Sequence, residues 1–145
     1  MRIELSCLLP RESEWVWSRV KKSETLHFVA APLIKFVPKD GEFPAIWSPG
    51  KYDVSMQMFG LIPLGSQTIG IEYPADSRSM ILRDNGNGLL AKQWDHWIFV
   101  EAENGGTRYT DRIDVSAGPL TPFVALFSRF FYAHRQRRWK LLARR

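Results

Sequence analysis

The sequence predicts an α+β fold in which a long C-terminal helix covers one antiparallel sheet. Hydrophobic and polar residues alternate from residue 51 to residue 117, which is the period of β-strands. The period becomes helical in residues 120–142. A sheet with a single apolar face needs a cover, and no other segment is long enough to supply one.

The chain before residue 51 predicts a first strand and two short helices. Residues 2–9 alternate weakly and form the expected strand. Residues 11–20 and 22–30 form the expected helices, with Ser13 and Ser23 as candidate N-caps. The segment that follows is rich in proline and glycine and predicts a loop with one short strand.

The alternating region predicts five further strands, at 51–59, 66–73, 78–84, 90–101 and 107–115. Residues 74–76 and the run DNGNG at 84–88 predict turns. Asn104-Gly105 lies between two alternating runs and predicts a two-residue hairpin loop. In the final helix, one apolar stripe is expected to contain Phe123, Phe127, Phe130, Phe131 and His134.

The predicted hairpin determines which side chains of its two strands point inwards. One face of residues 107–115 is fully polar and is expected to meet water. The opposite, inward face consists of Thr107, Tyr109, Asp111, Ile113 and Val115. A two-residue loop places position 98 opposite 111 and position 96 opposite 113. The inward face of the preceding strand is then Trp94, His96, Ile98 and Val100.

His96 and Asp111 are therefore expected on the same buried face, as diagonal neighbours or, with a longer loop, directly opposite. A buried carboxylate needs a hydrogen-bond donor, which His96, Tyr109 or Tyr52 can supply. The pair has three interpretations. It closes the sheet structurally, it orients a carbonyl or hydroxyl group of a ligand, or it acts as a general acid and base.

The outward face of the same strand carries two aromatic side chains, Trp97 and Phe99. Adjacent aromatic rings on a solvated sheet face predict either a homodimer contact or a cover by a neighbouring segment. The residues alone leave both alternatives open.

The net charge of +5 comes from the end of the chain. Residues 129–145 contain seven basic residues and no acidic one, whereas the rest has thirteen basic residues against fifteen acidic ones, a net of −2. The basic segment is either a solvated helix end that suits the helix dipole or a contact for a membrane surface. Nucleic acid is not expected as a partner, because its binders carry a wider basic face. The side chains expected to dock are Arg135, Arg137, Arg138, Lys140, Arg144 and Arg145.

Composition and motifs exclude several protein classes. The 145 residues predict one domain, 1–145. The single cysteine, Cys7, excludes an internal disulfide framework and is expected to be a small buried hydrophobe rather than a nucleophile. No histidine pair has metal-ligand spacing and no glycine-rich loop opens a helix, so neither a metal nor a nucleotide cofactor is expected. No segment has the pattern of a membrane span or signal peptide, which predicts a cytoplasmic protein.

The sequence resembles the START-like, or SRPBCC, superfamily. The resemblance is carried by residues 58–74, 83–101 and 105–115 and by the aromatic-rich final helix. Trp94-Asp95-His96, followed by Thr107 and Asp111, is similar to a W-x-H … T-x-x-x-D pattern of many bacterial members. The superfamily includes START lipid-transfer domains, pollen-allergen-like proteins, polyketide cyclases and coenzyme-Q-binding proteins.

The resemblance implies the helix-grip fold, in which a curved sheet grips the long helix around an apolar cavity. It also implies binding of a hydrophobic or aromatic molecule, lipid-, polyketide- or quinone-like. One alternative is an enzyme of the cyclase/dehydrase type using His96 and Asp111, and another is an accessory protein that docks through the basic segment. The predicted ligand-binding residues are Tyr52, Met56, Ile69, Ile71, Trp94, His96, Ile98, Tyr109, Asp111, Phe127 and Phe131.

Overall fold

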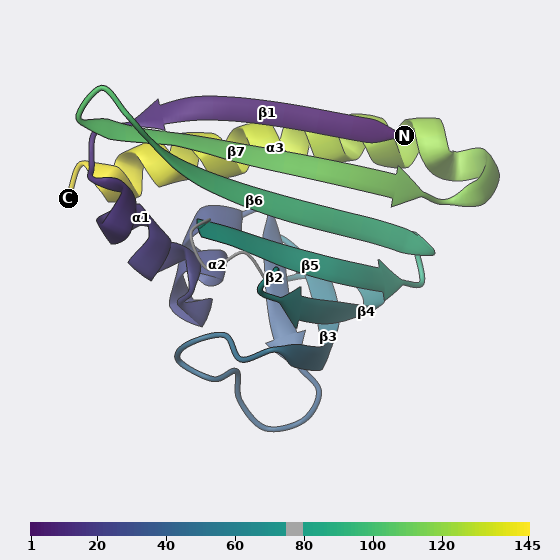
Figure 1. Ribbon diagram of the computed structural model, residues 1–145. Helices are drawn as coiled ribbons and strands as arrows, with labels where there is room; N and C mark the ends of the chain where they lie inside the picture. Colours follow the sequence, from purple (N-terminus) through teal and green to yellow (C-terminus); the bar gives the residue numbers. More distant parts are fainter. Residues whose placement is uncertain (75–79) are drawn as a thin grey trace.

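The computed structural model describes residues 1–74 and 80–145 (Figure 1). Seven strands of these residues form one antiparallel sheet in the order β1-β7-β6-β5-β4-β3-β2. The α+β fold predicted from the sequence is confirmed. Most of the predicted turn at 74–76, and the start of the strand predicted at 78–84, lie outside the described residues.

The elements follow one another along the chain as predicted. They are β1 (Arg2–Leu9), α1 (Ser13–Val20), α2 (Ser23–Ala30), β2 (Ile34–Pro38), β3 (Gly50–Met58), β4 (Ile62–Glu72), β5 (Met80–Gly88), β6 (Gln93–Glu103), β7 (Gly106–Ser116), the short 3-10 helix η1 (Gly118–Leu120) and α3 (Thr121–Ala143).

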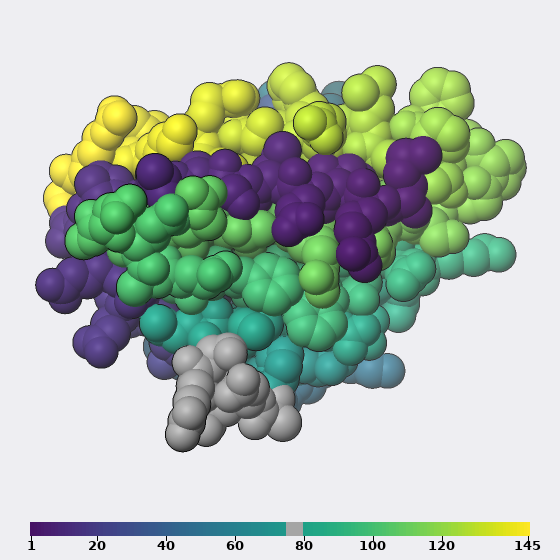
Figure 2. Space-filling view, turned by 45° about the horizontal axis from the view of Figure 1, so that its top comes forward, coloured from purple at the N-terminus to yellow at the C-terminus, as the bar shows by residue number. Residues whose placement is uncertain are grey.

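Helix α3 runs along the inner side of the curved sheet and packs chiefly on β1, β7 and α2 (Figure 1). In the space-filling view, β1 in purple and α3 in yellow and green lie side by side (Figure 2). Where α3 packs on β1 and β7, apolar side chains from the helix and from both strands form the core, among them Leu9, Ile113 and Trp139. Helices α1 and α2 lie near the C-terminal end of α3 (Figure 1).

The β6–β7 hairpin has the register that the sequence predicts. Glu103 pairs with Gly106, and the two loop residues, Asn104 and Gly105, have positive φ angles of 50° and 78°. Asparagine and glycine tolerate this backbone region better than other residues, which is why they specify the tight hairpin. The register places Ile98 opposite Asp111 and His96 opposite Ile113.

The predicted turn at 84–88 is wrong, because these residues belong to strand β5. Their glycines let neighbouring backbones approach closely rather than reverse the chain. A Cβ atom on Gly88 would lie 2.8 Å from the carbonyl oxygen of Ser66 in β4. The chain reverses just afterwards, where the backbone N–H of Gly88 donates to the carbonyl of Ala91.

The predicted N-caps are also corrected. The structure begins α1 and α2 at Ser13 and Ser23 themselves, after extended residues Glu12 and Lys22, and neither helix has a side-chain cap. The hydroxyl of Ser23 instead donates to the carbonyl of Pro44, at 2.6 Å. This serine thus ties the start of α2 to the long loop before β3.

Helix α3 turns only part of the predicted stripe towards the sheet: Phe131 is buried and Phe127 is half-buried. Phe123 and Phe130 are 71% and 60% exposed. The apolar residues of this helix surround it almost completely, so hydrophobicity alone did not orient it. The face that is buried combines aromatic and polar side chains, including Ser128, Phe131, Tyr132, Arg135, Gln136 and Trp139.

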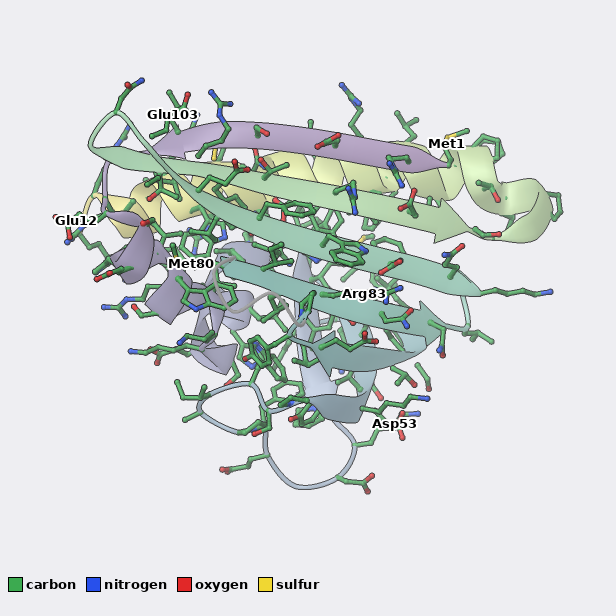
Figure 3. All side chains as sticks on the ribbon, viewed as in Figure 1. Met1, Glu12, Asp53, Met80, Arg83 and Glu103 are labelled. Atoms are coloured by element: carbon green, nitrogen blue, oxygen red, sulfur yellow. The ribbon has the colours of Figure 1, made fainter. Side chains whose placement is uncertain are left out.

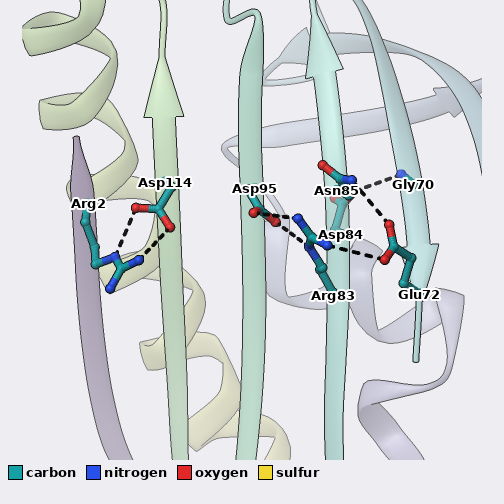
Figure 4. A network of polar contacts seen from close by, with 8 residues as sticks. All are labelled: Arg2, Gly70, Glu72, Arg83, Asp84, Asn85, Asp95 and Asp114. Carbon is teal, nitrogen blue, oxygen red and sulfur yellow. Dashed lines mark hydrogen bonds and ion pairs between the residues drawn. The ribbon is translucent and has the colours of Figure 1, made fainter. Parts of the chain in front are cut away.

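On the outer face of the sheet, Trp97 and Phe99 stack with their ring centroids 6.1 Å apart. The guanidinium carbon of Arg112 lies 5.2 Å and 4.9 Å from these two centroids. Arg83, labelled in Figure 3, lies 4.9 Å from the Trp97 ring and donates two hydrogen bonds of 2.9 Å to the buried Asp95 (Figure 4). Both rings are therefore half-covered by their own chain, and dimerisation through them stays a prediction.

Candidate functional site

A cavity of about 310 Å³ lies between the sheet and helix α3. The helix rests on β1 and β7 at one edge of the sheet, and inward side chains of β2 to β6 face the remaining space. Most of these side chains are apolar or aromatic. Small-molecule pockets typically measure about 300–1,000 Å³, so this cavity lies within their range.

The cavity reaches the molecular surface beside the start of α3. Leu90, Leu120 and Phe123 line it and are also exposed. They come from the β5–β6 loop, from η1 and from the first turn of α3. The entrance is therefore apolar, and three separate elements form it.

The structure brings most of the predicted ligand-binding residues to the cavity wall: Met56, Ile69, Ile71, Trp94, His96, Ile98, Tyr109, Phe127 and Phe131. Tyr52 and Asp111 are not in the wall. The ring of Tyr52 packs against Trp47, with centroids 5.2 Å apart, and its hydroxyl donates to the carbonyl of Ser48. That the wall residues bind a ligand stays a prediction.

Asp111 is fully buried behind the wall and accepts three hydrogen bonds. Nε2 of His96 lies 2.7 Å from one carboxylate oxygen, and the hydroxyl of Tyr109 donates to the same oxygen at 3.1 Å. The amide of Gln136 on α3 donates to the other oxygen at 3.1 Å. Two of the three predicted donors are thus present, Tyr52 is not among them, and Gln136 had not been predicted.

The two members of the buried pair have different charges. Burial is the strongest influence on Asp111 and raises its pKa, but the hydrogen bonds and nearby positive charge outweigh burial and leave the pKa lowered. Burial also dominates at His96, where it lowers the pKa despite the neighbouring carboxylate. Near neutral pH, Asp111 is therefore an anion and His96 a neutral ring that donates Nε2–H to it.

Two charged residues of the wall were missed from the sequence, Asp84 and Arg135. The sequence places Asp84 at the end of the strand predicted at 78–84 and at the start of the incorrect turn at 84–88, although it continues the inward parity of Leu82 and lies directly opposite His96 on β6. Arg135 belongs to the basic segment that the sequence predicts to be either a solvated helix end or a docking contact. Its position four residues after Phe131, on the inward side of α3, was the signal that could have placed it.

Asp84 is enclosed by protein and cavity, with the backbone N–H of Gly70 donating to it at 2.9 Å (Figure 4). Its side chain keeps some accessible surface because it forms part of the wall. Burial raises its pKa to about 7, and the single backbone hydrogen bond only partly opposes this. Asp84 therefore titrates near neutral pH.

The rest of the basic segment is less free than predicted. Arg138 donates to the carbonyl of Phe28 at 3.0 Å, and its guanidinium carbon lies 4.1 Å from that ring centroid. Arg137, Lys140 and Arg144 are exposed. Contact between these exposed side chains and a membrane surface stays a prediction.

Other candidate sites carry little chemistry. Cys7 is half-buried, and burial raises its pKa to about 11, so it is a protonated thiol near neutral pH. Across residues 1–74 and 80–145, no cluster of three or more His, Cys, Asp or Glu side chains can hold a metal ion. None of the helices in the same residues is long and apolar enough to cross a membrane.

No family model and no curated protein matches the sequence. Solved structures do match the fold. A START superfamily protein from Mycobacterium smegmatis has a TM-score of 0.72 at 14% identity, over 99% of this chain and 97% of that one. TTHA0849 from Thermus thermophilus has a TM-score of 0.70 at 11% identity, with the same coverage. The Zhui aromatase/cyclase from Streptomyces sp. R1128 has a TM-score of 0.65 at 8% identity, over 100% of this chain and 94% of that one.

This chain has the START-like fold. The helix-grip architecture predicted from the sequence is thereby confirmed. Because the identities are low, the likeness establishes the START-like fold alone, and any function must be argued from the side chains of the cavity.

Proposed function

We propose that this START-like protein binds a hydrophobic or aromatic small molecule in the cavity between the sheet and α3. The observation that carries the proposal is the cavity itself, a largely apolar space with only a few polar groups in its wall. Such a combination is typical of sites where apolar surface supplies affinity and a few polar atoms fix the orientation of the ligand.

A neutral fluorescent probe, N-phenyl-1-naphthylamine, tests the proposal. We expect saturable binding with a blue-shifted emission, because the probe leaves water for an apolar cavity. The variant Ile69→Trp fills the cavity from β4 and should weaken binding by roughly tenfold or more, whereas Thr68→Trp, on the opposite face of that strand, should not. Equal binding by both variants, or no binding by the wild type, would contradict the proposal.

A second candidate function is proton transfer at a bound ketone by His96. The observation that favours it is the 2.7 Å contact between Nε2 of His96 and Asp111, with the ring itself in the cavity wall. A neutral imidazole whose Nε2–H is held by a carboxylate can use Nδ1 to remove a proton from carbon next to a carbonyl. Asp111 then stabilises the imidazolium that forms.

Deuterium exchange into the methyl group of 2-acetylnaphthalene, followed by NMR in D₂O, tests this second function. We expect the wild type to accelerate exchange and His96→Gln to reduce it to the buffer rate while N-phenyl-1-naphthylamine still binds. If His96→Gln still accelerates exchange, or if the wild type does not accelerate it, proton transfer by His96 is contradicted and the cavity is left with a binding role.

A further inference from the structure

Arg135 is a charged residue in the wall of an otherwise apolar cavity. It lies on the inward face of α3 and is 6% exposed. Arginine is almost never this buried unless a partner neutralises its charge. Burial lowers its pKa, but the neighbouring Tyr109, Asp111 and Tyr132 outweigh burial, so the guanidinium stays charged.

Residues 1–74 and 80–145 supply no ion-pair partner for this guanidinium. Among the described residues, no carboxylate oxygen lies within 4.0 Å of it, and its Nε has no hydrogen-bond partner. The contacts on its faces are aromatic: the guanidinium carbon lies 5.1 Å from the Tyr132 ring centroid and 6.0 Å from that of Phe131. A buried cation that lacks a partner is costly, which indicates that its partner comes from elsewhere.

The two nearby acids do not fill this role. Asp111 already accepts hydrogen bonds from His96, Tyr109 and Gln136 and lies outside the cavity wall. Asp84 lies in the wall, but its hydrogen bond is to the backbone of Gly70. Besides the neighbouring hydroxyl of Tyr109, the described residues offer the N–H donors of this guanidinium no acceptor, and the guanidinium fork matches the geometry of an acid group.

We infer that the ligand is an organic acid whose apolar or aromatic body fills the cavity and whose anionic head group pairs with Arg135. This inference rests on the proposed function and adds the chemical class of the ligand. A carboxylate, a sulfonate or an ionised phenol supplies the required oxygen atoms, and an alcohol or hydrocarbon of the same size does not.

Two dyes with the same aromatic skeleton separate charge from apolar contact. 8-Anilinonaphthalene-1-sulfonate carries a sulfonate, and N-phenyl-1-naphthylamine lacks it. We expect the wild type to bind the sulfonate dye more tightly, and Arg135→Gln to weaken that dye by roughly tenfold or more, since charged hydrogen bonds are strong. Binding of the neutral dye should change less than about threefold. Arg137→Gln is the matched control, because Arg137 lies on the same helix but is exposed.

A second measurement needs no variant and therefore does not depend on how the substituted protein folds. Decanoate should displace the neutral dye from the wild-type protein at a lower concentration than 1-decanol.

Arg135→Lys, which keeps the charge, should retain part of the preference for acids. Circular dichroism of each variant checks that the fold is intact.

The outcomes separate the two proposals. If neither dye binds the wild-type protein, the proposed cavity function fails and this inference fails with it. If the neutral dye binds but decanoate and 1-decanol compete equally, or Arg135→Gln weakens both dyes alike, the cavity function stands and the acid preference is wrong.

Discussion

Asp84 and Asp111 both point inwards from one sheet, with only β6 between their strands. Their hydrogen bonds differ, and their pKa values are shifted in opposite directions. Asp111 lies under the packed part of α3 and accepts three side-chain hydrogen bonds. Asp84 faces the cavity, and its hydrogen-bond donor in the described residues is one backbone N–H. The pKa of Asp111 is accordingly lowered, and that of Asp84 is raised to about 7.

The difference shows what separates a structural acid from a functional one in this fold. Where α3 contacts the sheet, Asp111 accepts hydrogen bonds from protein side chains, and these bonds stabilise its ionised form. Where α3 stands away from the sheet, Asp84 and Arg135 face a cavity and keep hydrogen-bonding capacity for a ligand. Perturbed titratable groups that gather in a cavity are typical of binding and catalytic sites.

The largest effect on stability is expected for Asp111→Ala. The substitution leaves His96, Tyr109 and Gln136 without their common acceptor, which should lower the free energy of unfolding by about 3–5 kcal/mol in urea titrations. Asp114→Ala is the matched control on the same strand. Asp114 pairs with the exposed Arg2, so its loss should cost less than about 1 kcal/mol. Similar losses in the two variants would contradict the structural role of Asp111.

Asp84 should make the protein less stable as the pH rises. Burial raises its folded-state pKa from the ordinary 3.8 to about 7, so its contribution is complete below pH 4 and is lost as the pH rises through 7. The slope is about 1.4 kcal/mol per pH unit, which amounts to somewhat more than about 4 kcal/mol over the whole interval. This pH dependence is opposite to that of Asp111, whose contribution is lost as the pH falls.

Comparison of the wild type with Asp84→Asn isolates this titration. The free energy of unfolding of the wild type, measured from pH 4.5 to 8, should fall relative to that of the variant, which carries no ionisable group there. Asp53→Asn, at an exposed position on β3, should leave the profile of the wild type unchanged. Parallel profiles for the wild type and Asp84→Asn would show that Asp84 is ionised throughout.

The sequence predicted the Asp111 side of this comparison and missed the Asp84 side. The hairpin at Asn104-Gly105 has a loop of fixed length and one fully polar strand face, so its parity followed from local residues. That parity is enough to place His96 and Asp111 on one face. Local rules succeed there because turn chemistry, register and polarity agree.

Asp84 and Arg135 were missed because their roles depend on distant parts of the chain. The glycines after Asp84 predict a turn. In the structure they instead allow the backbone of β4 to approach closely, and the local sequence gives no sign of that neighbouring strand. Arg135 was interpreted as part of a basic tail, because a buried charge is expected only where a cavity or partner exists. Polar residues within an apolar stripe, such as Arg135 after Phe127 and Phe131, indicate such a cavity.

The smallest effect is expected for Tyr109→Phe, which tests how many donors Asp111 requires. The substitution removes a hydroxyl that donates at 3.1 Å and should cost about 1 kcal/mol. The pKa of Asp111 should rise with the loss of a donor, so acid unfolding should begin at a higher pH. Tyr52→Phe removes a hydroxyl from an exposed bond to Ser48 and should change stability by less than about 0.5 kcal/mol. If the two variants unfold alike at every pH, His96 and Gln136 alone satisfy the carboxylate, and the tyrosine hydroxyl is available to the cavity that its ring lines.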